Sequence, residues 1–513
     1  MREAQASVMH DTTIQEARLI VGGNWARRPD NAQGREAEDS ARGVPQIFGA
    51  VCTDSRKLVP GDLFVALKGE RYDGAEFLAQ AEQAGARAII TEGIPSGFEP
   101  RVPVILVASG LEALGRLARA HRERQKACVV GITGSNGKTT TRELAGAVLR
   151  QQFEVLQNTA NENNRVGVPQ TLLRLNDRHD FAIIEMGTSE RGEIAALAGI
   201  CTPQCAILTS IGASHLAGLG DLEGVMHEKS ALLAALPRDG IAIVNYDDAW
   251  CVRAGESANC RVVSYGTDAR CEIRAGDLRA NRHGTHFTLN CKHEFRLPLH
   301  GLHNVSNALA AIALGWVSGV DVPAMILALR RVEPVPGRLH FAEFGGVGVL
   351  DDSYNANPAS TLAALRTLAD FPCTGQRIAV LGDMLELGRH SALLHAELGR
   401  QAAVLDLDLV IAVGPEMNAA AEVLEAAMLR CGRGTVWRLP DSSAAAEAAA
   451  MEAREGDIVL VKGSHGMHME RVVQELRARN GALQPGLVLR ATVRERPVGD
   501  PLPDTLDARP AVA

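Results

Sequence analysis

The stretch GITGSNGKTTT, residues 131–141, decides the fold class. It follows the apolar, β-branched run CVVGIT and precedes TTRELAGAVLRQQ, whose apolar residues recur at helical spacing. A glycine-rich turn between a buried strand and a helix is typical of a phosphate-binding loop, because its successive backbone N–H groups can point at phosphate oxygens. The positive end of the following helix favours the same anion. The segment therefore predicts a nucleotide-binding α/β domain.

Two side chains give this loop its expected chemistry. Lys138 can reach the β- and γ-phosphates of a nucleotide, and the hydroxyl of Thr139 can ligate Mg²⁺. The usual pattern G-x-x-x-x-G-K-[ST] would need glycine where this chain has Ile132, and the glycines are instead spaced by three. Only seven of the 53 basic residues are lysine. The presence of lysine at position 138 therefore indicates a role that an amine can fill and a guanidinium cannot.

Three further residues are candidates for a metal site. Glu185 stands at the carboxyl end of the apolar run FAIIEMG, the edge of an α/β sheet that faces the ligand crevice. Mg²⁺ prefers oxygen ligands and one or two carboxylates, which Glu185 would supply. His215, just past another expected strand, suits a second metal ligand or a phosphate contact, and Lys229 follows fourteen residues later. An ion-paired glutamate and a solvated surface histidine remain the alternatives.

Polar residues also gather beyond residue 300. Asp352 lies in LDDSYNANP, where an acidic residue can accept hydrogen bonds from ribose hydroxyls. Asn304 and Asn307 are three apart on an expected helix and share a face, and an amide can read an adenine edge because it both donates and accepts. Lys462 ends the strand-like run before VKGS. Ordinary caps and turns would explain each of these equally well.

Composition narrows the function classes. The chain has 513 residues, which predicts three or four domains, and its 46% hydrophobic and 22% charged content is that of a globular protein. A net charge of -8 gives no basic footprint for nucleic acid, and no apolar run is long enough to predict a membrane span. Ten cysteines without a CxxC pair, and a start without a secretory pattern, predict free thiols in the cytoplasm.

Two regions alternate apolar strands with helices, which predicts an α/β fold with doubly wound sheets. The stretch 270–299 alternates differently and predicts a small antiparallel β-insert in the first of these regions, and PVPGR is a turn-rich break between them. The expected units are a poorly ordered extension at 1–45, a small α/β domain at 46–125, a central phosphate-loop domain at 126–333, a Rossmann-like domain at 334–480 and a mobile tail at 481–513.

Taken together, the motifs closely resemble those of the Mur ligase family of ATP-dependent amide-bond ligases. The resemblance runs from about residue 50 to 475 and rests on ten motifs in order: TDSRKLVPGDLFVALKGERYDG, GITGSNGKTTT, NTANENNRVGVPQTLLRL, IIEMG, ASHLAGLG, HNVSNALAA, PVPGR, DDSYNANP, LGDMLELG and VKGS. The family's loop has the form T-G-x-N-G-K-T, so the departure from the usual pattern supports the assignment. NENNRVGVP and DDSYNANP favour the branch that adds D-alanyl-D-alanine.

The resemblance implies three domains: one that binds the UDP end of the substrate, a central ATPase and a C-terminal Rossmann-like domain. It implies that ATP phosphorylates the terminal carboxylate of a UDP-N-acetylmuramoyl-tripeptide to an acyl phosphate, which the amine of D-alanyl-D-alanine then attacks. The protein would position the reactants and neutralise charge on the phosphoryl group. A monomer would suffice, with no nucleic-acid or membrane partner.

The resemblance also implies roles for individual residues, with Lys138, His215 and Lys229 as the catalytic set. Thr139 and Glu185 would hold one Mg²⁺, His215 would help to hold a second, and Lys229 would carry a carbamate that acts as a metal ligand. The ATP-binding residues would be Gly131, Thr133, Gly134, Ser135, Asn136, Gly137, Lys138, Thr139, Thr140, Asn304, Asn307, Arg338 and Asp352. The substrate-binding residues would be Ser55 and Arg56 near uridine, Asn163 and Asn164 near the UDP-linked substrate, and Asn357 and Lys462 from the third domain.

Some positions depart from the family pattern, and other functions stay open. Ala231 stands where the family often has Glu, the triplet HEK at 227–229 is unusual, and His465 replaces the usual Arg. A folylpolyglutamate synthetase-like ligase would share the phosphate loop but not the TDSR segment. A slow ATPase switch would hydrolyse ATP without amino-acid substrates. An inactive paralogue would not be expected to keep Lys138, Glu185 and His215.

Overall fold

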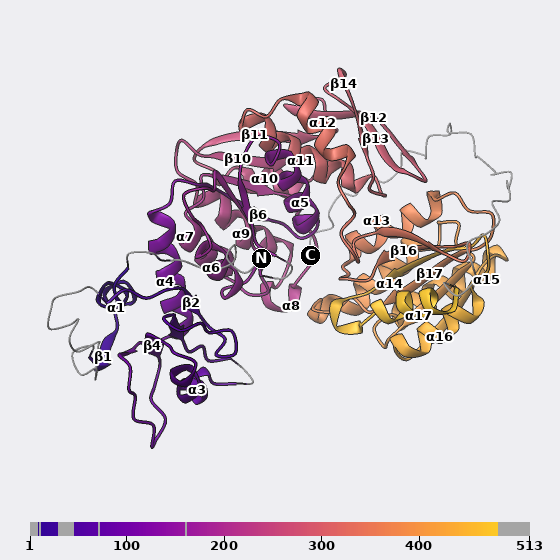
Figure 1. Ribbon diagram of the computed structural model, residues 1–513. Coiled ribbons are helices and arrows are strands. Elements are labelled where there is room, and N and C mark those ends of the chain that lie inside the picture. The colour runs from indigo at the N-terminus through magenta and orange to yellow at the C-terminus, as the bar shows by residue number, and fades with distance from the viewer. Residues whose placement is uncertain (1–8, 10–11, 29–45, 70–71, 160–161, 481–513) are drawn as a thin grey trace.

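The computed structural model describes residues 9, 12–28, 46–69, 72–159 and 162–480. Three sheets, of five, nine and six strands, follow one another along the chain (Figure 1). Helices cover the sheets, and most strands within each sheet run parallel. The expected α/β class, with its small first domain, central phosphate-loop domain with a β-insert and Rossmann-like last domain, is confirmed.

The first sheet has the strand order β1-β5-β4-β3-β2, in which only β1 is antiparallel to its neighbour. Strands β2 to β5 are short, mostly apolar runs that are largely buried, whereas β1 is polar and partly exposed. The elements are α1 (Ile14–Val21), β1 (Asn24–Arg27), β2 (Val51–Cys52), β3 (Leu63–Val65), η2 (Gly74–Phe77), α3 (Leu78–Gln83), β4 (Ala88–Thr91), β5 (Val104–Leu106) and α4 (Gly110–Glu123).

Helix α1 and strand β1 lie where the sequence analysis expected poor order, so that expectation does not hold for residues 12–28. Thr13 and Glu16 form a capping box, in which each side chain accepts a hydrogen bond from the other residue's backbone N–H. Ile14, Ala17 and Val21 are buried at helical spacing. The pattern T-x-x-E before such spacing was the available signal. Residues 1–8, 10–11, 29–45 and 481–513 lie outside the described residues.

The central sheet has the order β14-β13-β12-β11-β10-β9-β6-β8-β7. Strands β7 to β12 pair in parallel, whereas β12, β13 and β14 are antiparallel and form the expected insert. Its strands are β6 (Cys128–Thr133), β7 (Val155–Gln157), β8 (Phe181–Glu185), β9 (Cys205–Leu208), β10 (Ile241–Asn245), β11 (Arg261–Gly266), β12 (Ile273–Asn281), β13 (Gly284–Leu289) and β14 (His293–Leu297). Its helices are α5 (Lys138–Leu149), α6 (Gly167–Leu172), α7 (Glu193–Cys201), α8 (Leu216–Leu219), α9 (Leu222–Ala234), α10 (Ala249–Gly255), α11 (His303–Val317) and α12 (Val322–Arg330).

Strand β6 marks the point where the strand order of this sheet reverses. The chain passes from β6 to β7 and β8 on one side, and then returns to β9 on the other side. A crevice for ligands forms at such a point, outside the carboxyl ends of the strands. The phosphate loop follows β6, Glu185 is the last residue of β8, and the loop of His215 follows β9, so the topology brings all three to this crevice.

The third sheet has the order β15-β16-β20-β17-β18-β19, with only β15 antiparallel. The carboxyl ends of β16, β17 and β20 carry DDSYNANP, LGDMLELG and VKGS. The elements are β15 (His340–Phe344), β16 (Val347–Asp352), α13 (Pro358–Asp370), β17 (Arg377–Gly382), η3 (Gly388–His390), α14 (Ser391–Ala402), β18 (Leu409–Val413), α15 (Asn418–Cys431), β19 (Thr435–Leu439), α16 (Ser442–Glu452), β20 (Ile458–Lys462), η4 (His465–Met467) and α17 (Glu470–Asn480). In the part of the chain that the structure describes, no helix is long and apolar enough to span a membrane.

Candidate active site

The phosphate loop between β6 and α5 passes very close to its neighbours, which explains its glycines. A Cβ atom on Gly134 would lie 1.9 Å from Thr209 Oγ1, and one on Gly137 would lie 2.2 Å from Asn307 Oδ1. Both glycines also have positive φ, at +155° and +81°. The start of α5 leaves the N–H groups of its first turn without acceptors inside the helix. The loop therefore presents backbone donors where a phosphate would bind.

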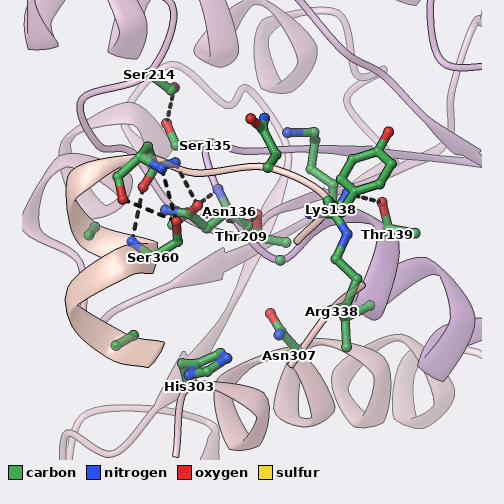
Figure 2. Close-up of a pocket in the computed structure, with 18 of the residues that line it drawn as sticks. Ser135, Asn136, Lys138, Thr139, Thr209, Ser214, His303, Asn307, Arg338 and Ser360 are labelled. Atoms are coloured by element: carbon green, nitrogen blue, oxygen red, sulfur yellow. Dashed lines mark hydrogen bonds between the residues drawn. The ribbon is translucent and has the colours of Figure 1, made fainter. Parts of the chain in front are cut away.

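Hydrogen bonds fix the loop against the end of β9. The N–H of Asn136 donates to Ser210 Oγ over 2.8 Å. Ser214 Oγ donates to Ser135 Oγ over 3.0 Å (Figure 2). Lys138 Nζ donates to the carbonyl of Gly134 over 2.7 Å. Burial lowers the pKa of Lys138, although the carboxylate of Glu185 opposes that effect. The ammonium thus lies inside the loop and is hydrogen-bonded to a backbone carbonyl.

Glu185, at the end of β8, is 2% exposed, and its carboxylate accepts hydrogen bonds from three described side chains. They come from Thr139 Oγ1 at 2.9 Å, Asn163 Nδ2 at 2.9 Å and an Arg142 guanidinium nitrogen at 3.2 Å. The structure thus brings together Thr139 and Glu185, as the resemblance implied. Sequence reasoning missed Arg142, although its place one turn after Thr139 puts both side chains on the same face of α5.

The fit of a magnesium ion can be judged from these donors. Among the described residues no group of three or more His, Cys, Asp or Glu side chains is arranged to hold a metal. A hydroxyl and a carboxylate are nevertheless hard oxygen donors, and Mg²⁺ commonly combines one or two of these with water and substrate phosphates. Thr139 and Glu185 therefore fit an ion that arrives with a nucleotide, rather than a closed protein cage.

His215 lies apart from this pair, at the start of α8, and lines the same cleft. Its Nδ1 contacts Oε2 of Glu386, a residue of the C-terminal sheet's β17–η3 loop. The interaction with His215 lowers the pKa of the Glu386 carboxylate. Glu386 belongs to LGDMLELG, a motif to which the sequence analysis gave no role.

Lys229, on α9, is 1% exposed and does not line the cleft. Burial, with the positive charge of Lys138, lowers its pKa to about 7. Its neighbour Glu228 accepts hydrogen bonds from the N–H groups of Gly192 and Ile194, at 2.6 and 2.7 Å. Glu228 thus satisfies the start of α7, which gives the unusual HEK triplet a structural reason.

Arg338, just after the central domain, reaches the phosphate loop. Its guanidinium donates to Thr139 Oγ1 over 3.5 Å (Figure 2). It also stacks on the ring of Tyr354, 3.8 Å from the ring centre. Burial lowers the pKa of Arg338, against the opposing charge of Glu185. A cation therefore stands beside Thr139 and Glu185.

The loop after β16 is fixed by a buried ion pair. Lys462 Nζ donates to Asp352 Oδ2 over 2.6 Å and to the carbonyl of Asn355 over 2.9 Å. Asn357, at the end of this loop, donates from Nδ2 to Asn136 Oδ1 in the phosphate loop over 2.7 Å. Lys462 is 2% exposed, so its ammonium holds the loop in place in this structure.

Asn304 and Asn307 lie on α11 beside the phosphate loop and form a buried chain of amides. Asn307 Nδ2 donates to Asn304 Oδ1 over 2.8 Å, and Asn304 Nδ2 donates to the carbonyl of His300 over 2.7 Å. Thr141 Oγ1 donates to Asn307 Oδ1 over 3.4 Å. The two amides share one face of the helix, as their spacing predicted.

One cleft of about 740 Å³ collects most of the predicted residues. Those that line it are Ser135, Asn136, Gly137, Lys138, Thr139, Thr140, Asn163, Asn164, Glu185, His215, Asn304, Asn307, Arg338, Asp352, Asn357 and Lys462. Those outside its lining are Ser55, Arg56, Gly131, Thr133, Gly134 and Lys229. Ser55 Oγ donates to Gln80 Oε1 over 2.9 Å, and Arg56 pairs with Asp54 at 2.8 Å in the first domain.

Comparison with known proteins gives a consistent result along the chain. Residues 48–122 match the "Mur ligase family, catalytic domain", residues 132–315 the "Mur ligase middle domain" and residues 337–465 the "Mur ligase, glutamate ligase domain". The UDP-N-acetylmuramoyl-tripeptide–D-alanyl-D-alanine ligase of Escherichia coli K12 is 37% identical over 444 residues, 85% of this chain and 95% of that protein. The chain belongs to the Mur ligase family. The resemblance inferred from the motifs is confirmed.

Solved structures agree with this Mur ligase assignment. MurF from Acinetobacter baumannii superposes with a TM-score of 0.80 at 31% identity, covering 91% of this chain and 98% of that one. The MurF ligase of Thermotoga maritima, in complex with ADP, gives a TM-score of 0.74 at 28% identity, covering 84% of this chain and 97% of that one.

Proposed function

We propose that this Mur ligase uses ATP to join the amine of D-alanyl-D-alanine to the terminal carboxylate of a UDP-N-acetylmuramoyl-tripeptide. The observation that carries the proposal is the cleft in which the phosphate loop and Glu185 face the DDSYNANP loop of the C-terminal domain. Relatives with this activity in their names align over most of the chain. The protein would form amide bonds in the cytoplasm, and it would act as a monomer.

The chemistry follows from the need to activate a carboxylate. A carboxylate oxygen of the tripeptide attacks the γ-phosphorus of ATP, ADP leaves, and an acyl phosphate forms. The amine of the dipeptide then attacks the acyl carbon, loses a proton, and expels inorganic phosphate. Lys138, Arg338 and the N–H groups at the start of α5 supply positive charge where the phosphoryl group is transferred.

The metal assignments extend this proposal. Thr139 and Glu185 would hold one Mg²⁺, and His215 would help to hold a second. When bound, Mg²⁺ neutralises charge on the phosphoryl oxygens. Lys229 would carry a carbamate that acts as a metal ligand. Only a neutral amine can add to CO₂, and the lowered pKa of Lys229 leaves part of the amine neutral near pH 7.

The remaining residues are assigned to the ends of the substrates. Ser55 and Arg56 would bind near uridine, and Asn163 and Asn164 near the rest of the UDP-linked substrate. A hydrogen bond of 2.6 Å from Gln170 Nε2 to Thr53 Oγ1 supports this, because it joins α6 to the TDSR segment. Asn304 and Asn307 would contact adenine, and Arg338 and Asp352 would contact the rest of the nucleotide. Asn357 and Lys462 would contact substrate when the domains close.

We also propose that the functional units are the domains at 46–125, 126–333 and 334–480. The first would bind the UDP end, the second would bind ATP, and the third would contact substrate through Asn357 and Lys462.

Mass spectrometry of the product tests the proposal. Purified protein would be incubated with ATP, Mg²⁺, D-alanyl-D-alanine and either the lysine or the diaminopimelate tripeptide. A UDP-linked pentapeptide is the expected product, and Lys138→Ala should not form it. A separate incubation would offer a folate and glutamate with ATP and Mg²⁺. A product formed there, and none from the tripeptide, would favour the folylpolyglutamate synthetase-like alternative.

A further inference from the structure

Two loops from different domains meet beside His215. Glu386 follows β17 in the C-terminal domain, and its carbonyl accepts a hydrogen bond from the N–H of Ala217 over 3.0 Å. The contact is tight, because a Cβ atom on Gly388 would lie 3.2 Å from Ala217 Cα. His215 and Glu386 both have left-handed backbones, at φ +53° and +64°. L-residues seldom adopt that conformation, so the surrounding contacts hold both residues in place.

The imidazole of His215 faces two environments. Its Nδ1 atom is buried and contacts Oε2 of Glu386, whereas the side chain as a whole is 24% exposed. The exposed part of the ring therefore lies away from Nδ1, and the residue lines the cleft. An ionised carboxylate can only accept hydrogen bonds. A hydrogen atom placed between this carboxylate and the imidazole therefore belongs to Nδ1.

A proton on Nδ1 has a consequence for the other nitrogen. In a neutral imidazole only one nitrogen carries hydrogen, so Nε2 keeps its lone pair. Metal-binding histidines commonly donate their second nitrogen to a carboxylate, which fixes the ring and its tautomer. Here the carboxylate comes from a different domain than the histidine does.

We propose that Glu386 is a positioning residue that holds His215 as the Nδ1–H tautomer, with Nε2 available to a divalent cation bound with nucleotide phosphates in the cleft. The cation site is therefore complete only when the C-terminal domain lies against the central domain. This inference rests on the proposed function, because it takes His215 as a cation ligand.

The tautomer can be measured without any reaction. Nitrogen-15 NMR of histidine-labelled protein, free of nucleotide and metal, should show Nδ1–H at His215, assigned by its loss in His215→Asn. In Glu386→Ala the Nε2–H form should rise. Glu386→Gln keeps an oxygen acceptor and should preserve the wild-type tautomer. The matched control is Glu425→Ala, which removes an exposed ion pair of 2.6 Å with Arg438 in the same domain.

Cation binding gives the second readout. Electron paramagnetic resonance of Mn²⁺ with a non-hydrolysable ATP analogue should show affinity reduced about 10- to 100-fold in Glu386→Ala, and close to wild type in Glu386→Gln and Glu425→Ala. A wild-type tautomer together with unchanged Mn²⁺ affinity in Glu386→Ala would overturn the inference. Neither readout needs amide synthesis, so a wild-type protein that forms no pentapeptide would refute the proposed function separately.

Discussion

The side-chain nitrogen of Asn357 donates a hydrogen bond to the side-chain oxygen of Asn136 across 2.7 Å, and so joins the C-terminal domain to the phosphate loop. The same side chain begins α13, because its Oδ1 accepts from the N–H of Ser360 over 3.0 Å. Figure 2 shows Ser360 facing the loop beside Asn136. One residue thus sets both the start of a helix and the contact between two domains.

Two substitutions of Asn357 should separate these roles. Asn357→Ala loses the cap and the domain contact, so we expect a stability loss of about 1 kcal/mol and weaker nucleotide binding. Asn357→Asp keeps an acceptor for the cap but loses the donor to Asn136, so it should bind ATP more weakly at near-native stability. Urea unfolding and calorimetric ATP titration would measure both. Equal ATP affinity in Asn357→Asp and wild type would argue against the contact.

Lys138→Ala should abolish most turnover while the protein still folds. Among the described residues the ammonium hydrogen-bonds only to a loop carbonyl, so its loss should leave the fold intact but remove positive charge from the transferred phosphoryl group. We expect kcat to fall by about 10²-fold or more. Steady-state kinetics with circular dichroism would check this, with exposed Lys292→Ala as the control. Near-wild-type kcat would refute the phosphate-loop assignment.

Glu185→Gln should raise the requirement for Mg²⁺. The amide keeps the size of the side chain and can still accept from Thr139, but it lacks the negative charge. We expect the Mg²⁺ concentration for half-maximal rate to rise about tenfold or more. Glu185→Ala is a poorer test, because it removes a partner of buried Arg142. An Mg²⁺ titration unchanged from wild type would exclude Glu185 as a ligand.

His300 should make the protein less stable in acid. Burial lowers its pKa from 6.5 to about 4, aided by repulsion from His283 and His340, and its ring packs 5.6 Å from Phe341 and 5.2 Å from Phe371. Between pH 6.5 and 4 the unfolded chain binds a proton that the folded chain does not, so stability falls as pH falls. The loss should reach at most about 1.4 kcal/mol per pH unit.

Urea midpoints at pH 7 and pH 5 would measure this effect. His300→Phe keeps an aromatic ring and removes the titration, so its midpoint should depend less on pH than that of the wild type. Exposed His293→Phe is the control and should keep the wild-type dependence. A His300→Phe midpoint that falls as steeply as the wild-type midpoint would contradict the assignment.

The sequence predicted those elements whose signal is local. Buried parallel strands such as β6 and β8 are continuous apolar runs, and the turn after β6 is recognised by its glycines and lysine. Strands β7 and β19 were missed because they lie at sheet edges and are partly exposed, so their residues form no apolar run. Helix α1 was missed because the polar residues on either side of it were taken for an unstructured extension, and the capping box of Thr13 and Glu16 was not recognised.

Only those site residues that lie in a local sequence motif could be predicted. Glu185 and Thr139 each follow a recognisable strand or loop, and the structure brings them together. The contact between His215 and Glu386 joins residues from different domains, and no pattern near either residue predicts its partner. Arg142 is similar, since a buried arginine on a helix is recognised only once its carboxylate is known.

The most direct measurement of the central claim is phosphate release from ATP and Mg²⁺ with the UDP-linked tripeptide and D-alanyl-D-alanine, offered singly and together, with bicarbonate present. The account predicts sustained release only when both substrates are present, with one pentapeptide formed per phosphate. Equal release without either substrate would contradict it and identify the protein as an ATPase switch.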